Sequence, residues 1–316
     1  GSQMWYDAGL TVDPNNPETV LLSGVDLYRS INGGTTFQDI TCGYGNGNVH
    51  VDHHARAFLP NGFGGYDSNK LLSGSDGGVF YTANAQFGTG GSTTSNRPTF
   101  ISLNQTIGSI ELYSGDITAG FATAANPGAS AGAQDNGSEY ARWPSGNQEP
   151  VQWTVRNGGD GIYTRIEPVN EQRWYYASQN GAVVVSQTGP AGGTSNATPA
   201  QSGWGGDTLS FVFPFELYRY GELDVAGSGC STNIGCSYML GGTNRVWETL
   251  EGGIPRSSWY PNSPNLTKNT LGNRSFINQL AHAVKTPSVV IVGTNDGNVQ
   301  FGYNLNQGVA DSASWV

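Results

Sequence analysis

Three of the four histidines in the chain, His50, His53 and His54, lie within five residues of one another, and Asp52 lies among them. An imidazole beside a carboxylate can act as a general base or as a metal ligand. In a strand, His50, Asp52 and His54 share a face, but residues two apart are separated by about 6.7 Å. All three can reach one ion only if the strand bulges or begins after His50.

A site with two ligands from this window, completed by a carboxylate from elsewhere, is geometrically easier. We expect Asp52 and His54 with Asp76 as candidate metal ligands, and Ca²⁺ as the candidate cation. The alternative is structural: His53 or His54 caps backbone groups where a strand begins.

Carboxylates in this chain could also carry acid–base chemistry. Hydrolysis of a glycosidic bond needs two carboxylates about 5–5.5 or 6.5–9.5 Å apart across that bond. Candidate catalytic residues are Asp52, His53, Asp76 and Asp135. The sequence leaves open whether the chain is an enzyme. The aspartates in Asp-Gly or Asp-Asn-Gly sequences could be catalytic, but a plain hairpin turn requires the same residues.

Further candidates would contact a ligand without reacting with it. Asp160 follows two glycines at the start of an expected strand, where it serves either a tight turn or a ligand. The indole of Trp259 lies in a Gly/Ser/Pro-rich segment, where it could stack on a sugar. The candidate ligand-binding residues are Asp7, His54, Tyr113, Asp160, Trp259 and Tyr260.

A repeated segment predicts which elements hold these residues. Leu21-Leu22-Ser23-Gly24-Val25-Asp26 returns fifty residues later as Leu71-Leu72-Ser73-Gly74-Ser75-Asp76. Repeats of this length, built on short apolar runs and turns, are typical of propellers and stacked arrays. Similar turns contain Asp135, Asn180, Asn244 and Asp296.

The spacing predicts an all-β chain, a β-propeller of six to seven four-stranded blades. We expect one propeller domain over residues 1–316, as a fragment of a longer chain. The expected blades span residues 5–41, 49–107, 111–156, 158–201, 209–267 and 274–316. The turns after the second strands and the loops before the first strands then share one rim, with Asp7, Asp52, His53, Tyr113 and Asp160 beside the turn residues.

Composition limits the partners. Charged residues make up 12% of the 316 residues, and the formal net charge is -10. Because nucleic-acid binding needs clustered Lys and Arg, we expect no nucleic-acid partner. No apolar run approaches the roughly 20 residues of a membrane span. Neutral sugars, metal cations or a protein surface are compatible with this charge.

Cys230 and Cys236 enclose five residues in a Gly/Ser-rich segment. We expect a disulfide between them and a buried thiol at Cys42. The low charge, the few cysteines and the many Asn, Ser and Thr residues favour an extracellular, secreted protein.

Ser30-Ile31-Asn32-Gly33-Gly34-Thr35-Thr36-Phe37 resembles the Asp-box, Ser-x-Asp-x-Gly-x-Thr-Trp, with Asn for Asp and Phe for Trp. Shorter fragments of the box begin at Thr82, Thr249 and Asn304. On these residues the chain resembles the BNR/Asp-box propeller superfamily, which includes sortilin-like, xyloglucanase-like and sialidase-like propellers. The resemblance implies a propeller with an extracellular, often carbohydrate-related role, and boxes that are folding elements remote from the active face.

Together these patterns predict a secreted propeller module whose acidic, aromatic-bearing face binds a ligand, with carbohydrate as the first choice. A glycoside hydrolase or polysaccharide lyase acting at the same face is the alternative. A third hypothesis is a structural or assembly module that contacts an extracellular protein surface.

Overall fold

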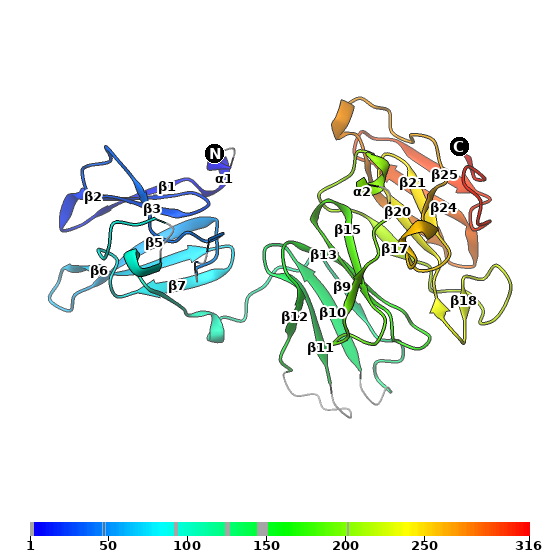
Figure 1. Cartoon of the computed structure of the whole chain (residues 1–316), viewed down its shortest axis with the longest axis horizontal. Helices are drawn as coiled ribbons and strands as arrows, with labels where there is room; N and C mark the ends of the chain where they lie inside the picture. The colour runs from blue at the N-terminus through cyan, green and yellow to red at the C-terminus, as the bar shows by residue number, and fades with distance from the viewer. Residues whose placement is uncertain are drawn as a thin grey trace. The chain divides into compact units, whose positions relative to one another are not determined.

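A computed structural model describes residues 3–45, 47, 49–91, 94–123, 127–143, 151–200 and 202–316 (Figure 1). The chain divides into two compact units, Gly1–Ile110 and Glu111–Val316, and each is described by itself. The expectation of a single propeller domain stays a prediction.

The first unit contains two four-stranded sheets and short helices. Its elements are α1 (Met4–Asp7), β1 (Gly9–Asp13), β2 (Asn16–Ser23), β3 (Leu27–Ser30), β4 (Gln38–Asp39), β5 (His53–Pro60), β6 (Tyr66–Ser75), β7 (Gly78–Thr82), η1 (Thr94–Asn96), β8 (Phe100–Ser102) and η2 (Asn104–Thr106).

The second unit contains four such sheets and one two-stranded ribbon. Its first two sheets are β9 (Ser114–Ile117), β10 (Gly128–Ala133), β11 (Gly137–Arg142) and β12 (Thr154–Asn157), then β13 (Gly161–Ile166), β14 (Trp174–Ser178), η4 (Gln179–Gly181), β15 (Ala182–Ser186) and β16 (Thr194–Asn196). The rest comprises α2 (Ser202–Gly205), β17 (Phe215–Leu217), β18 (Cys230–Ser231), β19 (Gly235–Cys236), β20 (Met239–Gly242), β21 (Val246–Thr249), η5 (Arg256–Ser258), β22 (Tyr260–Pro261), η6 (Gly272–Arg274), β23 (Ile277–Ala283), β24 (Thr286–Thr294), β25 (Val299–Tyr303) and β26 (Ser314–Trp315).

Each four-stranded sheet is an antiparallel meander, with neighbouring strands paired in chain order once the β18–β19 ribbon is set aside. This is the blade unit of a β-propeller. Within the described residues there are six such sheets, and the α-helices, α1 and α2, have four residues each. The prediction of an all-β, propeller-type chain is therefore confirmed. Five of the six described sheets lie inside the residue ranges expected for the blades, and the sheet β9–β12 ends at Asn157, one residue beyond its expected range.

The hairpin turns follow from residues that tolerate left-handed backbone. In the β10–β11 turn, Asp135 has φ 62° and Gly137 has φ 89°. Asn180 in the β14–β15 turn has φ 57°. Asp and Asn enter this region more readily than other non-glycine residues, and glycine enters it freely. The polar turn residues noted in the sequence thus end the second strand of a sheet and reverse the chain.

Apolar side chains between successive sheets hold each unit together. Leu21, Leu27, Leu71, Phe80 and Phe100 form a buried cluster between the two sheets of the first unit. A fully buried side chain of this size contributes about 1.5–3 kcal/mol relative to an exposed one. In the second unit the largest cluster is aromatic and contains Trp204, Trp247 and Trp259 among its buried side chains. These clusters require each sheet to present an apolar face to its neighbour.

The Asp-box-like segment forms the β3–β4 turn and is tied internally by side chains. The Ser30 hydroxyl donates to Asn32 Oδ1 at 2.9 Å, and the N–H groups of Gly34 and Thr36 donate to Ser30 Oγ and Asn32 Oδ1. After β7, the Thr82 hydroxyl likewise donates to Asn84 Oδ1 at 2.8 Å. In a meander the third turn lies at the opposite end of the sheet from the second turn, so these boxes are remote from Asp26 and Asp76.

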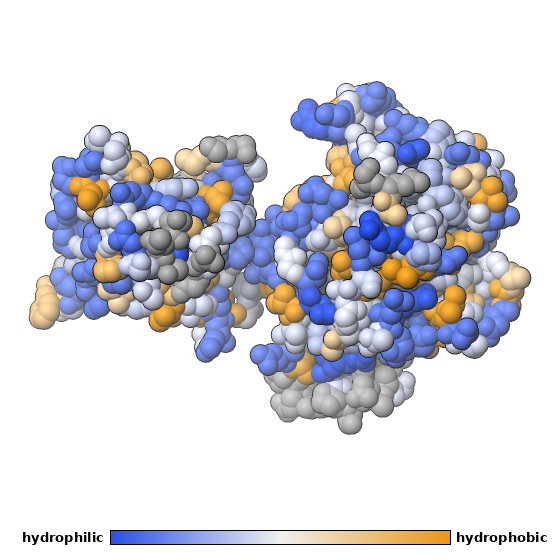
Figure 2. Space-filling view, in the orientation of Figure 1, coloured by the Kyte–Doolittle hydropathy of each residue, from blue (hydrophilic) through white to orange (hydrophobic). Residues whose placement is uncertain are grey.

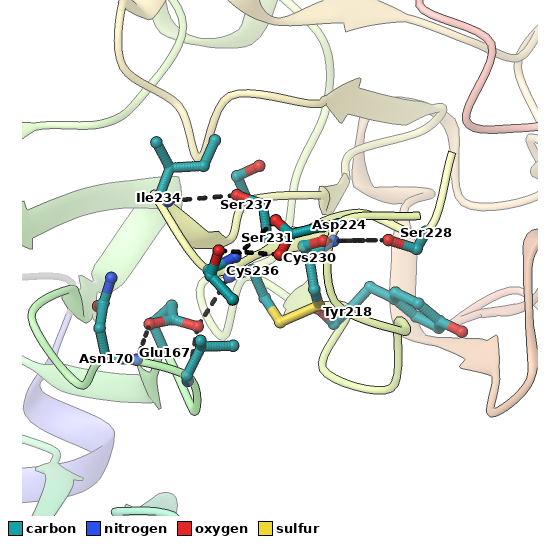
Figure 3. Close-up of a disulfide and its surroundings, with 12 residues drawn as sticks. Glu167, Asn170, Tyr218, Asp224, Ser228, Cys230, Ser231, Ile234, Cys236 and Ser237 are labelled. Carbon is teal, nitrogen blue, oxygen red and sulfur yellow. Dashed lines mark hydrogen bonds between the residues drawn. A yellow bond between two sulfur atoms is a disulfide. The ribbon is translucent and has the colours of Figure 1, made fainter. Parts of the chain in front are cut away.

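The structure contains the Cys230–Cys236 disulfide, in the ribbon formed by β18 and β19 (Figure 3). Glu167, which is fully buried, fastens this ribbon to the β13–β14 connection: its Oε1 accepts hydrogen bonds from the N–H groups of Val169 and Cys236. Cys42 is half-buried, with φ 51°, so the expectation of a buried thiol was wrong. A turn position with positive φ leaves its sulfur partly exposed.

No helix in the described part of the chain has the length and apolarity needed to cross a membrane. Figure 2 shows hydrophilic and hydrophobic residues interspersed over the visible face of each unit.

Replacing Cys230 and Cys236 together by Ser should lower the free energy of unfolding by about 2 kcal/mol, because a cross-link over six positions removes only modest entropy from the unfolded chain. Urea denaturation of wild type and variant measures this difference. Cys42→Ser is the control and should change stability little. Equal stability of the double variant and the wild type would contradict the prediction.

Candidate functional site

In the first unit, backbone hydrogen bonds bring the start of β5 to the β2–β3 turn. The Asp52 N–H donates to the Val25 carbonyl at 2.8 Å, and the His53 N–H donates to the Gly24 carbonyl at 3.0 Å. Asp52 has φ 62°, so the regular strand begins only at His53. The strand therefore begins after His50, which is one of the two alternatives that the sequence left open, because the chain turns at Asp52 to make these two bonds.

The β6–β7 turn places Asp76 beside the same strand start. His53 pairs with Ser75 across β5 and β6, and the Asp76 N–H lies 3.3 Å from the Asp52 carbonyl. A carboxylate oxygen of Asp52 lies within 4.8 Å of one of Asp76. Two carboxylates from distant parts of the sequence thus meet at one end of the unit. We call this end of the first unit the acidic rim; it comprises Asp7, Asp52, His54, Asp76 and the helix α1.

His54 and Tyr6 hold the Asp76 carboxylate from two sides. His54 Nε2 lies 2.6 Å from Asp76 Oδ1, and the Tyr6 hydroxyl donates to Oδ2 at 3.1 Å. The Tyr6 and His54 rings meet edge to face, with centroids 4.6 Å apart. The His54 side chain is 35% exposed and that of Asp76 is 13% exposed, so this pair is open to a ligand.

Asp52 is more enclosed, with 6% of its surface exposed. Its Oδ1 accepts a hydrogen bond from the Gln3 amide at 2.7 Å. Burial raises the pKa of the Asp52 carboxyl, and the negative charges of Asp76 and Asp7 raise it further, while His50 and His54 oppose them. Asp52 therefore holds a proton more readily than an ordinary exposed aspartate.

Asp7 ends helix α1 and is 2% exposed. Neither of its carboxylate oxygens has a hydrogen-bond partner among the described residues. A carboxylate without a partner is costly to bury, so this side chain needs a proton, a water or a cation beside it.

The His53 side chain is buried inside the first unit. It is fully buried, its Nδ1 lies 2.8 Å from Ser73 Oγ, and its Nε2 has no partner within the part of the chain that the structure describes. Burial lowers the pKa of His53 to about 4, and Arg56, His50 and His54 add to this effect against Asp26. The described contact of His53 is thus with a side chain rather than with the backbone groups that the structural alternative named, and its catalytic role stays a prediction.

The second unit has a comparable set of contacts between successive sheets. Asp160, before β13, accepts on Oδ1 a hydrogen bond from the N–H of Asp135 at 3.1 Å. The N–H of Asp160 in turn donates to Gln179 Oε1 at 3.1 Å. Tyr113 hydrogen-bonds Gln134, and burial raises its pKa, with contributions from nearby carboxylates that include Asp135. Asp135, Asp160 and Tyr113 therefore lie together in this unit.

The sugar platform expected at Trp259 was wrong. Trp259 is 4% exposed, packs in the aromatic core, and donates its indole N–H to the Ala197 carbonyl. Tyr260 is half-buried, and its hydroxyl donates to Glu248 Oε1 at 2.9 Å. A Gly/Ser/Pro-rich segment can fold back over a core, and sequence composition does not reveal that packing.

The exposed aromatic residue beside the carboxylates is instead Trp5, which is 85% exposed. Its ring centroid lies 5.7 Å from that of Tyr6. Trp5 lies in the helical turn Met4–Asp7, at the start of the expected blade 5–41, and strand β1 begins only at Gly9. The lack of alternation in Met4-Trp5-Tyr6-Asp7 was the signal that could have revealed this turn.

Neither the protein-family models nor the curated proteins contain a match to this chain. Among solved structures, the chain is similar to Sqt1 of Chaetomium thermophilum, with TM-score 0.46 and 12% identity over 94% of this chain and 69% of that chain. It is also similar to YCF48 bound to D1 peptide (TM-score 0.38, 15% identity, 99% and 83% covered) and to the RRP9 WD40 repeats (0.40, 12%, 97% and 78%). Likeness this distant carries no argument about function, and the comparisons do not support the BNR/Asp-box family.

The buried His53 should make stability depend on pH. Its pKa is about 4 in the folded chain and about 6.5 when unfolded, so between these values the unfolded chain binds more protons at this side chain. Its contribution is fully present above pH 6.5 and is lost as pH falls toward 4, by roughly 3 kcal/mol in all. Denaturation of wild type and His53→Asn from pH 4 to pH 7.5 measures it. The variant should show a smaller loss at acid pH, and parallel curves would contradict this account.

Proposed function

We propose that this chain is a carbohydrate-binding propeller module whose acidic rim contacts the sugar. The observation that carries the proposal is Trp5, a tryptophan with 85% of its surface exposed, next to Tyr6 and the half-open pair of His54 and Asp76. Ligand sites combine an apolar or aromatic wall with a few oriented polar groups.

A sugar ring has an apolar face and an edge of hydroxyl groups. The indole of Trp5 offers a flat surface for the apolar face. The carboxylates of Asp76 and Asp52 offer oxygens that accept hydrogen bonds from hydroxyl groups, and such charge-assisted bonds are stronger than neutral ones. Gln3 and Tyr6 orient these carboxylates before a ligand arrives.

The geometry of the boxes supports membership in the BNR/Asp-box superfamily as part of this proposal. In the β3–β4 turn, Asn32 stands at the Asp position of the pattern, and its Oδ1 accepts a hydrogen bond from the Thr36 N–H at 2.9 Å. The disulfide between Cys230 and Cys236 supports an extracellular location, since disulfides persist in oxidising compartments.

Glycoside hydrolysis at the same rim is a second candidate, favoured by the Asp52–Asp76 pair. Asp52 is enclosed and has a raised pKa, as a general acid requires, while Asp76 is more exposed. Oxygens of the two carboxylates lie within 4.8 Å of each other, which is below the range of about 5–5.5 Å in retaining enzymes and far below the 6.5–9.5 Å of inverting ones.

Trp5→Ala should weaken glycan binding about tenfold or more, because it removes the stacking surface and leaves the carboxylates in place. A glycan array identifies the ligand, and calorimetry on wild type and variant measures the affinities. Phe63→Ala is the matched control: Phe63 is 96% exposed, but it lies in the β5–β6 turn at the other end of that sheet.

Equal affinities for Trp5→Ala and wild type would contradict the sugar contact. Failure to bind any glycan would overturn the proposal in favour of the assembly module.

For the hydrolase candidate, Asp52→Asn and Asp76→Asn should each reduce turnover of a bound glycan at least a hundredfold, because each removes a group that transfers a proton or stabilises charge. Reducing-end assays on the same glycan panel measure this. Absence of turnover by the wild type would leave binding alone as the function of the rim.

A further inference from the structure

The acidic rim gathers three carboxylates, and the hydrogen bonds described for the nearby Arg56 guanidinium go to Thr11, Ser23 and the His54 carbonyl rather than to these carboxylates. Asp52 and Asp76 have oxygens within 4.8 Å of each other, and the negative charge of Asp7 acts on Asp52 as well. The cationic groups that act on Asp52 are His50 and His54, which carry full charge only when protonated. Carboxylates this close repel one another unless a proton or a cation lies between them.

The burial of the Asp7 carboxylate is a second observation, independent of the Asp52–Asp76 distance, that points to a bound cation. At 2% exposure it is cut off from bulk solvent, and neither oxygen has a hydrogen-bond partner among the described residues. Asp7 directly follows Tyr6, which donates to Asp76, and its helix α1 begins one residue after Gln3, which donates to Asp52. A buried, unpartnered carboxylate beside two others is the environment in which a bound cation lowers the free energy most.

From this arrangement we propose that the acidic rim binds one divalent cation, Ca²⁺, held between Asp52 and Asp76 and electrostatically supported by Asp7. Ca²⁺ takes oxygen ligands at about 2.3–2.6 Å, so an ion between two oxygens that lie within 4.8 Å of each other meets both at ordinary distances. Its flexible coordination accepts water or sugar hydroxyl groups at the remaining positions.

Hydrogen bonds from neighbouring side chains orient the two carboxylates. His54 Nε2 lies 2.6 Å from Asp76 Oδ1, and the Tyr6 hydroxyl donates to Oδ2 at 3.1 Å. The Gln3 amide donates to Asp52 Oδ1 at 2.7 Å. Outer-shell partners of metal ligands hold their carboxylates in this way. His54 is accordingly assigned to orient Asp76 rather than to bind the ion.

The cation site goes beyond the proposed sugar site and does not depend on it. Calcium binding is measured with CaCl₂ alone, so its failure is distinguishable from a failure to bind glycans. If both proposals hold, the cation should strengthen glycan affinity, because it offers its open positions to hydroxyl groups next to Trp5.

The test is calorimetric titration of chelator-treated protein with CaCl₂, together with melting temperatures with and without the ion. The wild type should bind one equivalent and melt at a higher temperature with Ca²⁺, because the ion binds the folded chain. Asp52→Asn and Asp76→Asn should each weaken binding at least tenfold. Asp67→Asn is the matched control, since Asp67 is on the same strand β6 but pairs with Lys70 near its other end.

No heat and no shift in melting temperature for the wild type would overturn the proposal, as would equal binding by all three variants. Should the rim variants fail to fold, Tb³⁺ bound to wild type and Trp5→Phe gives a second measurement. Emission sensitised by excitation at tryptophan wavelengths should fall at least threefold in Trp5→Phe while Ca²⁺ affinity is unchanged. Unchanged emission would place the ion elsewhere and overturn the assignment.

Discussion

Hydrogen bonds that join the second turn of one sheet to the first strand of the next are the constraint on which the rim depends. In the first unit they run from Asp52 and His53 to the carbonyls of Val25 and Gly24. In the second unit, the N–H of Ile277 bonds the carbonyl of Thr243 at 2.7 Å in the same way. Buried backbone groups must be paired, so each sheet can begin only where its neighbour turns.

This constraint explains how polar side chains come together at one end of sheets that are held by apolar contacts. The apolar clusters between the sheets fix their spacing, and the turn-to-strand bonds fix which ends of the strands lie together. Asp52 and Asp76 flank the paired residues His53 and Ser75 at the ends of two adjacent strands, and Asp52 adopts positive φ where its N–H bonds the neighbouring turn. Repulsion between the two carboxylates is therefore built into the fold, and it is this repulsion that a cation or a ligand hydroxyl group can relieve.

The repeat of Leu21–Asp26 in Leu71–Asp76 was enough to predict the sheets, because turn chemistry and strand alternation are local properties. The same local properties gave the disulfide of Cys230 and Cys236 and the grouping of Asp52 with Asp76. Side-chain burial was harder to foresee: Trp259 fills a core that distant strands create, and no local pattern distinguishes it from an exposed platform. In the helical turn Met4–Asp7, Tyr6 contacts Asp76 and His54, which lie 70 and 48 positions away, and sequence spacing does not report these contacts.

Native-state hydrogen exchange of the Asp52 and His53 amides tests the central claim most directly. The account predicts protection comparable to that of amides in the middle of β6, such as Leu72, because both N–H groups are bonded to the neighbouring sheet. Exchange as fast as that of the exposed β5–β6 turn would show that the two sheets are not joined at this point. The acidic rim would then lack the element that assembles it.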